Sequence, residues 1–348
     1  MYDINKTFEE NIAFGPIANL NFPEVKSIKR KYSFLGHKLN SLFGVAASPL
    51  THGSRAVSVC SRLGYDIITY RSVRSIEWHG QKYPHLLYAS IPKQLLVEDL
   101  SKSFTASFKP FQKQAVSMAN SFGIQSLKPE YWQSDFEIAK RLLLPNQLLI
   151  LSLMFTPETG TDVVKDAATV AKYAEETSAS VFEINLAHPN SGMKSLVFED
   201  ASVSLAICKQ VKKILGDRPL LAKVGYYKNT RTLHEFMERS KGIIAGISST
   251  NTYSVSITDT KNNLIFPGRP KAGISGNGLR TLSMNQAKKI VEFKKSLRLK
   301  NFVSIGIGGV IKTNHVKQYF DLGVNAVQAV VGIFVDPYLG IKYKNKYL

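Results

Sequence analysis

The sequence predicts an α/β fold in which a parallel sheet closes into an eight-stranded barrel ringed by helices, a (β/α)8 TIM barrel. Short apolar, β-branched runs recur along the 348 residues, and stretches with helical spacing lie between them. No GxGxxG follows an early run, which disfavours the runner-up, a doubly wound open sheet. The predicted strands are residues 42–47, 65–70, 147–153, 181–185, 219–224, 242–248, 302–306 and 326–330, and helix-like segments include residues 161–178, 201–215, 283–296 and 313–322.

Two long stretches interrupt this alternation, residues 72–144 and residues 251–282. Loops that follow barrel strands gather at the C-terminal face, so we expect both insertions there, as lids or pocket walls. Little chain follows residue 330, which predicts a shortened last helix and a barrel that closes incompletely or is completed by a partner. We divide the chain into an N-terminal extension, residues 1–33, and a barrel domain, residues 34–348.

Composition excludes several classes of protein. The chain has no apolar run of about 18 residues and no secretory pattern at its start, so we expect a cytoplasmic protein with no transmembrane segment. Cys60 and Cys208 stand alone, which argues against zinc, a Cys-ligated iron–sulfur cluster or a disulfide scaffold. We expect no metal.

The chain is strongly basic, since 45 Lys and Arg minus 26 Asp and Glu give a net charge of +19. Such a charge attracts nucleic acid, anionic membranes or anionic ligands, or it forms a lysine-rich solvated surface. The local clusters at residues 26–31 and 342–346 lie in no recognisable nucleic-acid motif. This favours the solvated surface, and we do not expect a nucleic-acid partner.

The most informative motif is residues 184–191, where two asparagines bracket a histidine and a proline after an apolar run. The carboxamides of Asn185 and Asn190 each offer a donor and an acceptor, which suits a planar heterocycle with C=O and N–H groups. His188 can move a proton near neutral pH. The segment predicts a substrate-binding loop with its own acid/base, and the alternative is that His188 only fills space.

A glycine-rich turn, residues 304–310, follows the seventh predicted strand and leads into a helix. Its backbone N–H groups could bind a phosphate at the place where barrels often hold one, or the glycines could serve a tight turn with positive φ. We favour the phosphate interpretation. A second glycine-rich stretch, residues 272–279, is a weak signal for either a cofactor-covering loop or a crossover.

Lys223 lies within an apolar run, where a buried cation needs an anionic partner, so we expect it in a site rather than at a solvent-exposed strand end. Asn251 follows the sixth predicted strand, and Asn120 lies in the first insertion. A lone asparagine is usually a turn or cap residue. With Asn185 and Asn190, however, these two form a set predicted at one rim.

Taken in order, these segments resemble the dihydroorotate dehydrogenase family, the FMN-dependent barrels that oxidise dihydroorotate to orotate. Residues 34–47 resemble the opening hairpin and first strand, residues 78–84 the "xGNPxPR" loop, and residues 120–123 the "NSMG" stretch of soluble class 1 members. Residues 184–190 match "NxSCPN" or "NxSSPN". Lys223, residues 250–252, 273–276 and 306–309 follow in the family's order.

The resemblance implies FMN at the barrel mouth and a pyrimidine-like substrate. It assigns cofactor binding to Ala46, Ala47, Ser72, Asn185, Lys223, Gly276, Gly308, Gly309, Val330 and Val331, and substrate binding to Asn120, Asn185, Asn190, Asn251 and Thr252. His188 and Lys223 become the catalytic pair: Lys223 stabilises negative charge on the reduced flavin, and His188 exchanges the proton.

The chain departs from the family at several positions. His188 stands where members carry Cys or Ser, and Thr51 and Arg71 stand where the usual lysines of the two types lie. Arg71 or His52 could replace that cation. Residues 330–331 are both valine, which removes a hydroxyl from the phosphate site.

The predicted function is hydride transfer between a dihydroorotate-like pyrimidine and FMN, with His188 as acid/base, and a homodimer is an open expectation. One alternative is a diverged flavin oxidoreductase that acts on another amide or C=C substrate, and another is a non-catalytic flavin-binding barrel. A flavin enzyme acting on RNA bases is disfavoured, because neither a catalytic cysteine nor an appended RNA-binding domain is visible.

Overall fold

Eight parallel strands form the centre of the molecule. The computed structural model describes residues 2–15, 20–23, 28–111, 115–187 and 196–348. The strands pair in chain order and close on themselves, since the last pairs with the first; they are β3 (Phe43–Val45), β4 (Ile67–Val73), β8 (Leu148–Leu153), β9 (Phe182–Asn185), β10 (Leu220–Val224), β11 (Gly246–Ser249), β14 (Val303–Ile307) and β15 (Ala326–Ala329). The predicted barrel is therefore confirmed, and each strand overlaps one predicted run. The expectation of incomplete closure is wrong.

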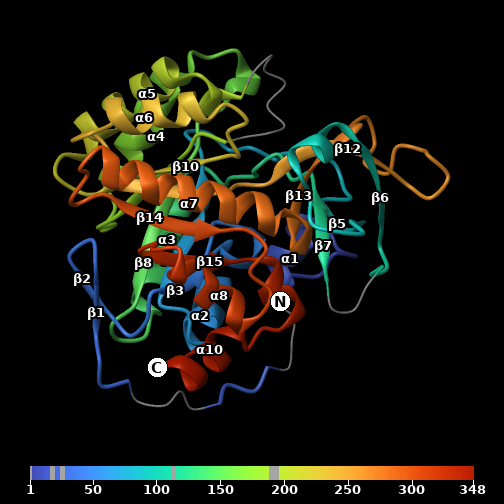
Figure 1. The fold of residues 1–348 in the computed structure, drawn as a ribbon, viewed down its shortest axis with the longest axis horizontal. Coiled ribbons are helices and arrows are strands. Elements are labelled where there is room, and N and C mark those ends of the chain that lie inside the picture. Colours follow the sequence, from blue (N-terminus) through green and yellow to red (C-terminus); the bar gives the residue numbers. More distant parts are fainter. Residues whose placement is uncertain (1, 16–19, 24–27, 112–114, 188–195) are drawn as a thin grey trace.

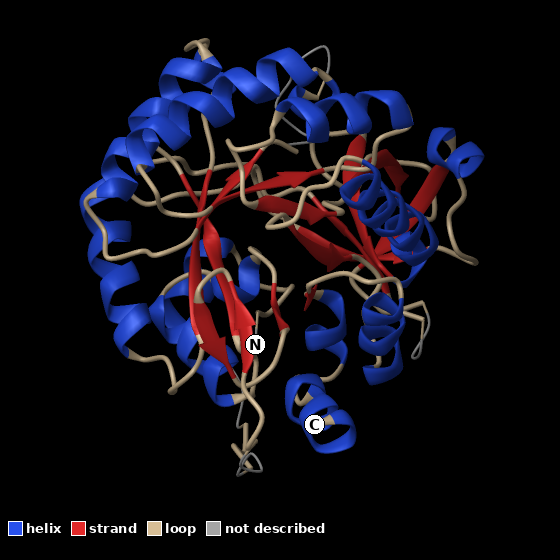
Figure 2. Ribbon diagram, turned by 60° about the vertical axis from the view of Figure 1, so that its left-hand side comes forward, coloured by secondary structure: helices blue, strands red, loops and turns tan. Residues whose placement is uncertain are grey.

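Helices surround this barrel (Figure 2). They are α2 (Ser54–Arg62), α3 (Pro129–Arg141), α4 (Val163–Glu175), α5 (Ala201–Leu215), α6 (Thr230–Arg239), α7 (Arg280–Ser296), α8 (Thr313–Asp321), the short α9 (Val331–Val335) and α10 (Leu339–Tyr347). Local sequence fixes several of their starts. The side chains of Asp162 and Asp200 each accept two backbone N–H groups at the beginnings of α4 and α5, and Asn229 caps α6.

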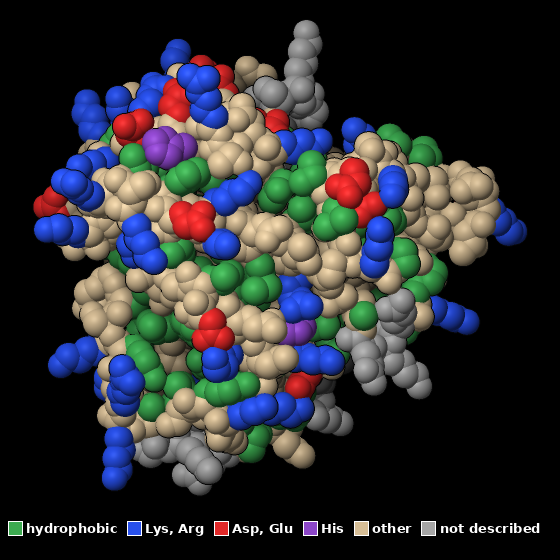
Figure 3. Space-filling view, in the orientation of Figure 1, with side chains coloured by type: hydrophobic (Ala, Val, Ile, Leu, Met, Phe, Trp, Pro, Cys, Tyr) green, Lys and Arg blue, Asp and Glu red, His purple; other side chains and the backbone are tan. Residues whose placement is uncertain are grey.

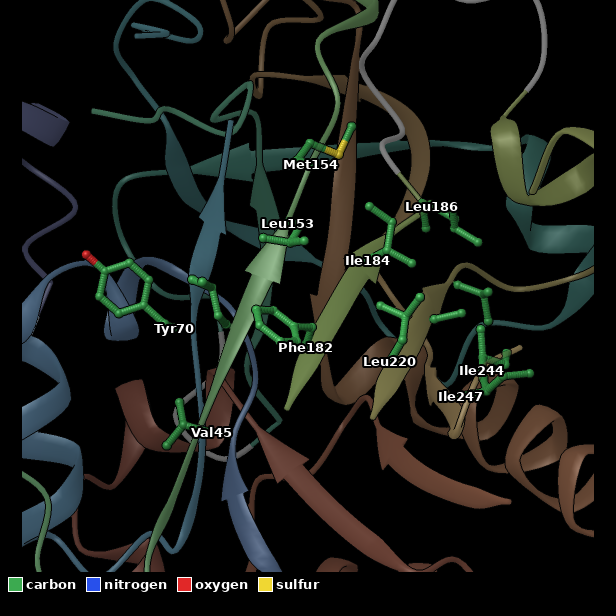
Figure 4. Packing of buried hydrophobic residues seen from close by; sticks show 14 of the residues in the cluster. Val45, Tyr70, Leu153, Met154, Phe182, Ile184, Leu186, Leu220, Ile244 and Ile247 are labelled. Carbon is green, nitrogen blue, oxygen red and sulfur yellow. The ribbon is translucent and has the colours of Figure 1, made fainter. Parts of the chain in front are cut away.

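The core has two layers. Outward-facing side chains of the strands pack against the helices, and Figure 4 shows Val45, Leu153, Phe182 and Leu220 in this cluster. Burial of each such side chain stabilises the fold by roughly 1.5–3 kcal/mol. Inside the barrel, residues near the starts of the strands pack with Phe34 of the hairpin formed by β1 (Tyr32–Phe34) and β2 (His37–Leu39). The barrel interior is thus filled at its N-terminal end, which leaves the opposite end for a site.

A second, smaller sheet lies beside the barrel, on the right in Figure 1. It is also closed, in the order β12–β13–β7–β5–β6, with bounds Leu86–Ser90 for β5, Ser103–Ser107 for β6, Ser117–Asn120 for β7, Tyr253–Thr258 for β12 and Lys271–Gly276 for β13. The first insertion supplies β5 to β7 and the second supplies β12 and β13. The two stretches that interrupt the strand–helix alternation therefore build one structure together.

The two ends of the described chain both pack on the barrel, at opposite faces. Helix α1 (Phe8–Phe14) begins with a capping box between Thr7 and Glu10. Near the other end, α10 is held by a buried ion pair between Lys344 Nζ and Asp66 Oδ2, 2.7 Å apart. Asp66 immediately precedes β4, so this contact fixes α10 to the N-terminal end of the barrel.

Lys and Arg side chains are spread over the face shown in Figure 3, with Asp and Glu between them. This distribution is typical of a solvated surface rather than of a groove that binds a polyanion. No helix in the described ranges is long and apolar enough to cross a membrane. Within the same ranges, no three His, Cys, Asp or Glu side chains are grouped so as to hold a metal ion.

Candidate active site

An open cavity lies at the carboxyl ends of the barrel strands. Its wall includes residues that end or follow five of the strands, and residues of β7 and β13 from the small sheet complete it. Carboxyl ends of parallel barrel strands are where loops bring distant residues together, so this is the expected place for a functional site.

Every described residue that the sequence assigned to the site lines this cavity. From the cofactor set these are Ala46, Ala47, Ser72, Asn185, Lys223, Gly276, Gly308, Gly309, Val330 and Val331, and from the substrate set Asn120, Asn185, Asn251 and Thr252. His188 and Asn190 lie outside the described residues, so their roles stay predictions.

Lys223 is the buried cation on β10. It is 4% exposed, and its Nζ donates a long hydrogen bond of 3.4 Å to Ala47 O. Burial lowers the pKa of Lys223, and the nearby carboxylate of Glu183 partly opposes that shift. Lys223 pairs in register with Asn185 of β9. A buried ammonium beside the carboxamides therefore faces the cavity, where it can stabilise negative charge.

The described asparagines are held by hydrogen bonds to the protein. Asn251 Nδ2 donates to Ala187 O at 2.6 Å and to Asn185 Oδ1 at 3.3 Å, while Asn251 Oδ1 accepts from Thr252 N at 2.8 Å. Asn120 Nδ2 donates to the carbonyl of Gly273 at 2.9 Å. Asn251 thus links the end of β11 to the segment that leads into residue 188, and its side chain has a clear structural role.

The glycine-rich stretch at residues 272–279 is strand β13 and the turn that follows it, not a covering loop. Gly273 is required by close approach, because a Cβ there would lie 2.4 Å from Thr252 Oγ1. The absence of a side chain at Gly273 therefore leaves room for the side chains of both Thr252 and Asn120.

The turn after β14 has the tight, positive-φ geometry of one of its two interpretations. Gly308 and Gly309 have φ of +122° and +66°, and a Cβ on Gly309 would lie 2.2 Å from Arg280 Cβ. The same turn borders the cavity near the start of α7, where the backbone N–H of Thr281 already donates to Gln94 Oε1 at 3.1 Å. Positive φ is required for the turn, and phosphate binding by its backbone N–H groups stays a prediction.

Arg71 is the cation that occupies the region of the missing lysines. It lines the cavity and is 4% exposed, and its Nη2 donates to Gln125 Oε1 at 2.7 Å. Its guanidinium lies 4.8 Å from the ring centre of Phe8 and 4.9 Å from that of Phe122. Burial lowers the pKa of Arg71 to about 10, so it remains charged at neutral pH.

The other candidate, His52, does not line this cavity. Its ring packs edge-on against Phe8, with ring centres 4.4 Å apart, and burial lowers its pKa well below the usual value. Sequence reasoning left the choice between Arg71 and His52 open and missed Phe8 and Phe122. Phe8 could have been found only from the placement of the N-terminal segment, and the contact of Phe122 only from the placement of the first insertion.

These residues fit FMN. The cavity offers two buried cations and a glycine turn with backbone donors near a helix start, a donor set that suits a large, flat, anionic molecule. The fold and the site thus define an α/β barrel whose cavity at the C-terminal face suits an anionic, planar ligand.

Comparison with known proteins specifies the family. The sequence profile of dihydroorotate dehydrogenase matches residues 111–345. The chain is 27% identical to the dihydroorotate dehydrogenase of Dictyostelium discoideum, over 99% of this chain and 96% of the relative. It is 25% identical to the catalytic subunit of dihydroorotate dehydrogenase B (NAD(+)) of Brachyspira hyodysenteriae, over 66% and 71% of the two chains.

The chain belongs to the dihydroorotate dehydrogenase family. It is an FMN-dependent oxidoreductase that acts on CH–CH bonds of a pyrimidine-like small molecule. Both the family profile and the relative from Dictyostelium discoideum cover the motifs around Asn185, Lys223 and Gly308.

Proposed function

We propose that this enzyme oxidises dihydroorotate or a closely similar ring acid, with His188 as the group that exchanges the proton. The observation that carries the proposal is the convergence of Asn120, Asn185, Asn251 and Lys223, from four distant segments, on one cavity. Carboxamides that face a planar cyclic imide can pair with its alternating C=O and N–H groups. Asn190 would add a fifth polar side chain from the loop after β9.

In this proposal each group has a separate task. FMN supplies the hydride acceptor. The asparagines and Thr252 orient the substrate ring, Lys223 stabilises negative charge next to the flavin, and His188 removes a proton from the carbon beside the one that loses hydride. The imidazole of His188 needs no activating partner at neutral pH, unlike the serine of other members.

The binding surface for FMN is assigned in the same way. Backbone groups of Gly308, Gly309 and the Val330–Val331 turn would hold the phosphate, and Ala46, Ala47, Ser72, Asn185, Gly276 and Lys223 would surround the rest of the cofactor. The support is that all of these residues border one cavity.

The proposal also covers the architecture around the site, the location of the protein and its oligomeric state. The two insertions would wall the site at the C-terminal face, and α10 would be the shortened last barrel helix. We also propose the division into an N-terminal extension of residues 1–33 and a barrel domain of residues 34–348, a cytoplasmic location and a homodimer.

The decisive experiment concerns His188. Anaerobic reduction of the bound flavin by dihydroorotate is followed against pH in the wild type and in His188→Ala. The wild-type rate should fall below a pKa near that of a histidine, about 6.5, and the variant should lose roughly 10²–10⁴-fold in rate together with that pH dependence. FMN content and orotate binding control for folding. A variant that keeps both the rate and the acidic limb would refute the role of His188.

A further inference from the structure

The N-terminal segment contacts the active-site arginine. Residues 2–15 lie against the cavity wall: Phe8 of α1 stacks on Arg71 at 4.8 Å, and Tyr2 packs edge-on against Phe122 and Phe334 at ring-centre distances of 5.7 and 6.5 Å. Neither Arg71 nor Phe8 falls within the residues that match the family profile.

Arg71 differs from a purely structural arginine. Arg74, three residues later, bonds through all three of its nitrogens, to three carbonyls and to the carboxylate of Glu158. Arg71 has no carboxylate partner, and its Nη1 is buried with no hydrogen-bond partner among the described residues. A buried cation with an unused donor is costly unless something else neutralises it. Because this side chain lines the cavity, an anionic group of a ligand meets that need.

We propose that Phe8 positions Arg71, so that the N-terminal segment builds the part of the site that binds the anionic group of the substrate, a carboxylate on the ring. This inference rests on the proposed function. Arg71 would contact that carboxylate through Nη1, and Phe8 acts only through Arg71.

The geometry explains how this positioning works. The guanidinium lies within 5 Å of the centres of two aromatic rings, that of Phe8 at 4.8 Å and that of Phe122 from the first insertion at 4.9 Å, and Gln125 accepts a hydrogen bond from Nη2. These two ring contacts restrict rotation of the planar group and shield it from water, while Nη1 keeps no hydrogen-bond partner among the described residues and can donate to an oxyanion. Removal of either ring should therefore cost carboxylate affinity without loss of the charge.

Phe8 is itself fixed by local structure. It is 4% exposed, and it is the first residue of α1, inside the capping box formed by Thr7 and Glu10. Asn11 ties the helix back to the chain start, since its side chain accepts from Asp3 N at 2.7 Å and donates to Asp3 O at 2.9 Å. A helix this short is marginal alone, so these caps hold the ring in place.

The chain offers a matched control. Phe22, also in the N-terminal extension, stacks on Arg62 at 3.6 Å, and neither of these residues lines the cavity. Phe22→Ala therefore removes the same kind of contact without touching Arg71. Phe8→Trp restores an aromatic face at position 8 and tests rescue.

The experiment uses the full-length, FMN-loaded enzyme and two probes, orotate, which carries a carboxylate, and uracil, the same ring without it. Dissociation constants come from titration of the flavin absorbance. Phe8→Ala should weaken orotate binding about tenfold and change uracil binding by less than about twofold. Phe8→Trp should recover most of the loss, and Phe22→Ala should match the wild type.

A double variant tests whether Phe8 acts through Arg71. Arg71→Gln should weaken orotate binding by roughly 10²-fold, and Phe8→Ala should add nothing in that background, because it acts through Arg71. Equal losses for orotate and uracil, or additive losses in the double variant, would overturn the proposal. Protein that is purified without FMN, or that binds neither probe, contradicts the proposed function instead. Enzyme that binds orotate tightly and is indifferent to Phe8 contradicts only this inference.

Discussion

Asn251 donates from its side-chain Nδ2 to the carboxamide oxygen of Asn185, at 3.3 Å, and to the backbone carbonyl of Ala187, at 2.6 Å. It thereby connects two strands of the barrel just before residue 188. The residue that sequence reasoning assigned to substrate binding is therefore also the anchor of the loop that carries the predicted acid/base.

Replacement of that donor should disable the enzyme. Asn251→Asp keeps the size of the side chain but places a carboxylate oxygen against two acceptors, which costs about 1–3 kcal/mol and displaces the loop. We expect kcat/KM for dihydroorotate to fall at least ~10-fold and up to ~10²-fold with FMN retained. Asn301→Asp, on an exposed asparagine, is the control and should behave as wild type.

The glycine turn after β14 should tolerate no side chain. Gly309→Ala meets both positive φ, +66°, and a Cβ contact at 2.2 Å with Arg280 Cβ, so we expect purified protein to contain much less FMN per chain. Gly160→Ala is the matched control, because its φ is +73° but no heavy atom lies within 4 Å. It should cost only about 1–2 kcal/mol in stability and keep full FMN content. Equal FMN content in both variants would contradict the phosphate assignment.

Removing one member of the buried ion pair between Lys344 and Asp66 should lower the free energy of unfolding more than removing both members. Lys344→Met leaves Asp66 charged and buried, and we expect a loss of about 3–5 kcal/mol in the free energy of urea unfolding. Adding Asp66→Asn should recover much of it. Lys342→Met removes an ion pair with Asp336 in which the lysine side chain is 59% exposed, and should cost no more than about 1 kcal/mol.

His315 should make the fold sensitive to acid. Burial, with the charges of Arg280 and Lys312, lowers the pKa of His315 to about 4 from the usual 6.5. The unfolded chain therefore binds this proton first, and stability falls as pH drops from 6.5 to 4, by on the order of 2 kcal/mol. His315→Asn, which can keep the contact that Nδ1 makes with Gly309 O at 3.1 Å, should flatten that part of the unfolding profile. An unchanged pH dependence would contradict this origin.

The barrel could be predicted because its strands are buried on both faces and read as continuous apolar runs. The run at residues 147–153 became Leu148–Leu153, and helix α5 has the predicted bounds. The small sheet could not be predicted, because strands such as β6 and β12 are short and half polar. These two pair in parallel, yet Ser103 and Ser256 lie far apart in the sequence. Local pattern contains no information on that register.

The site divides in the same way. The positions of Lys223 and Asn185 could be predicted from the sequence, because each lies at or next to the end of a recognisable strand. Their place at the C-terminal face then follows from the fold. The environment of Arg71 could not be predicted, since the direction of a side chain beside an insertion depends on long-range packing. Phe8 lies in a seven-residue helix, which is too short for its pattern to indicate the surface that it covers.

The most direct test of the account is anaerobic addition of dihydroorotate to the FMN-loaded wild-type protein. We expect the flavin absorbance to bleach within seconds and orotate to form in equal amount to the flavin reduced. A flavin that stays oxidised under saturating dihydroorotate would contradict the assignment of this cavity as a dihydroorotate-oxidising site.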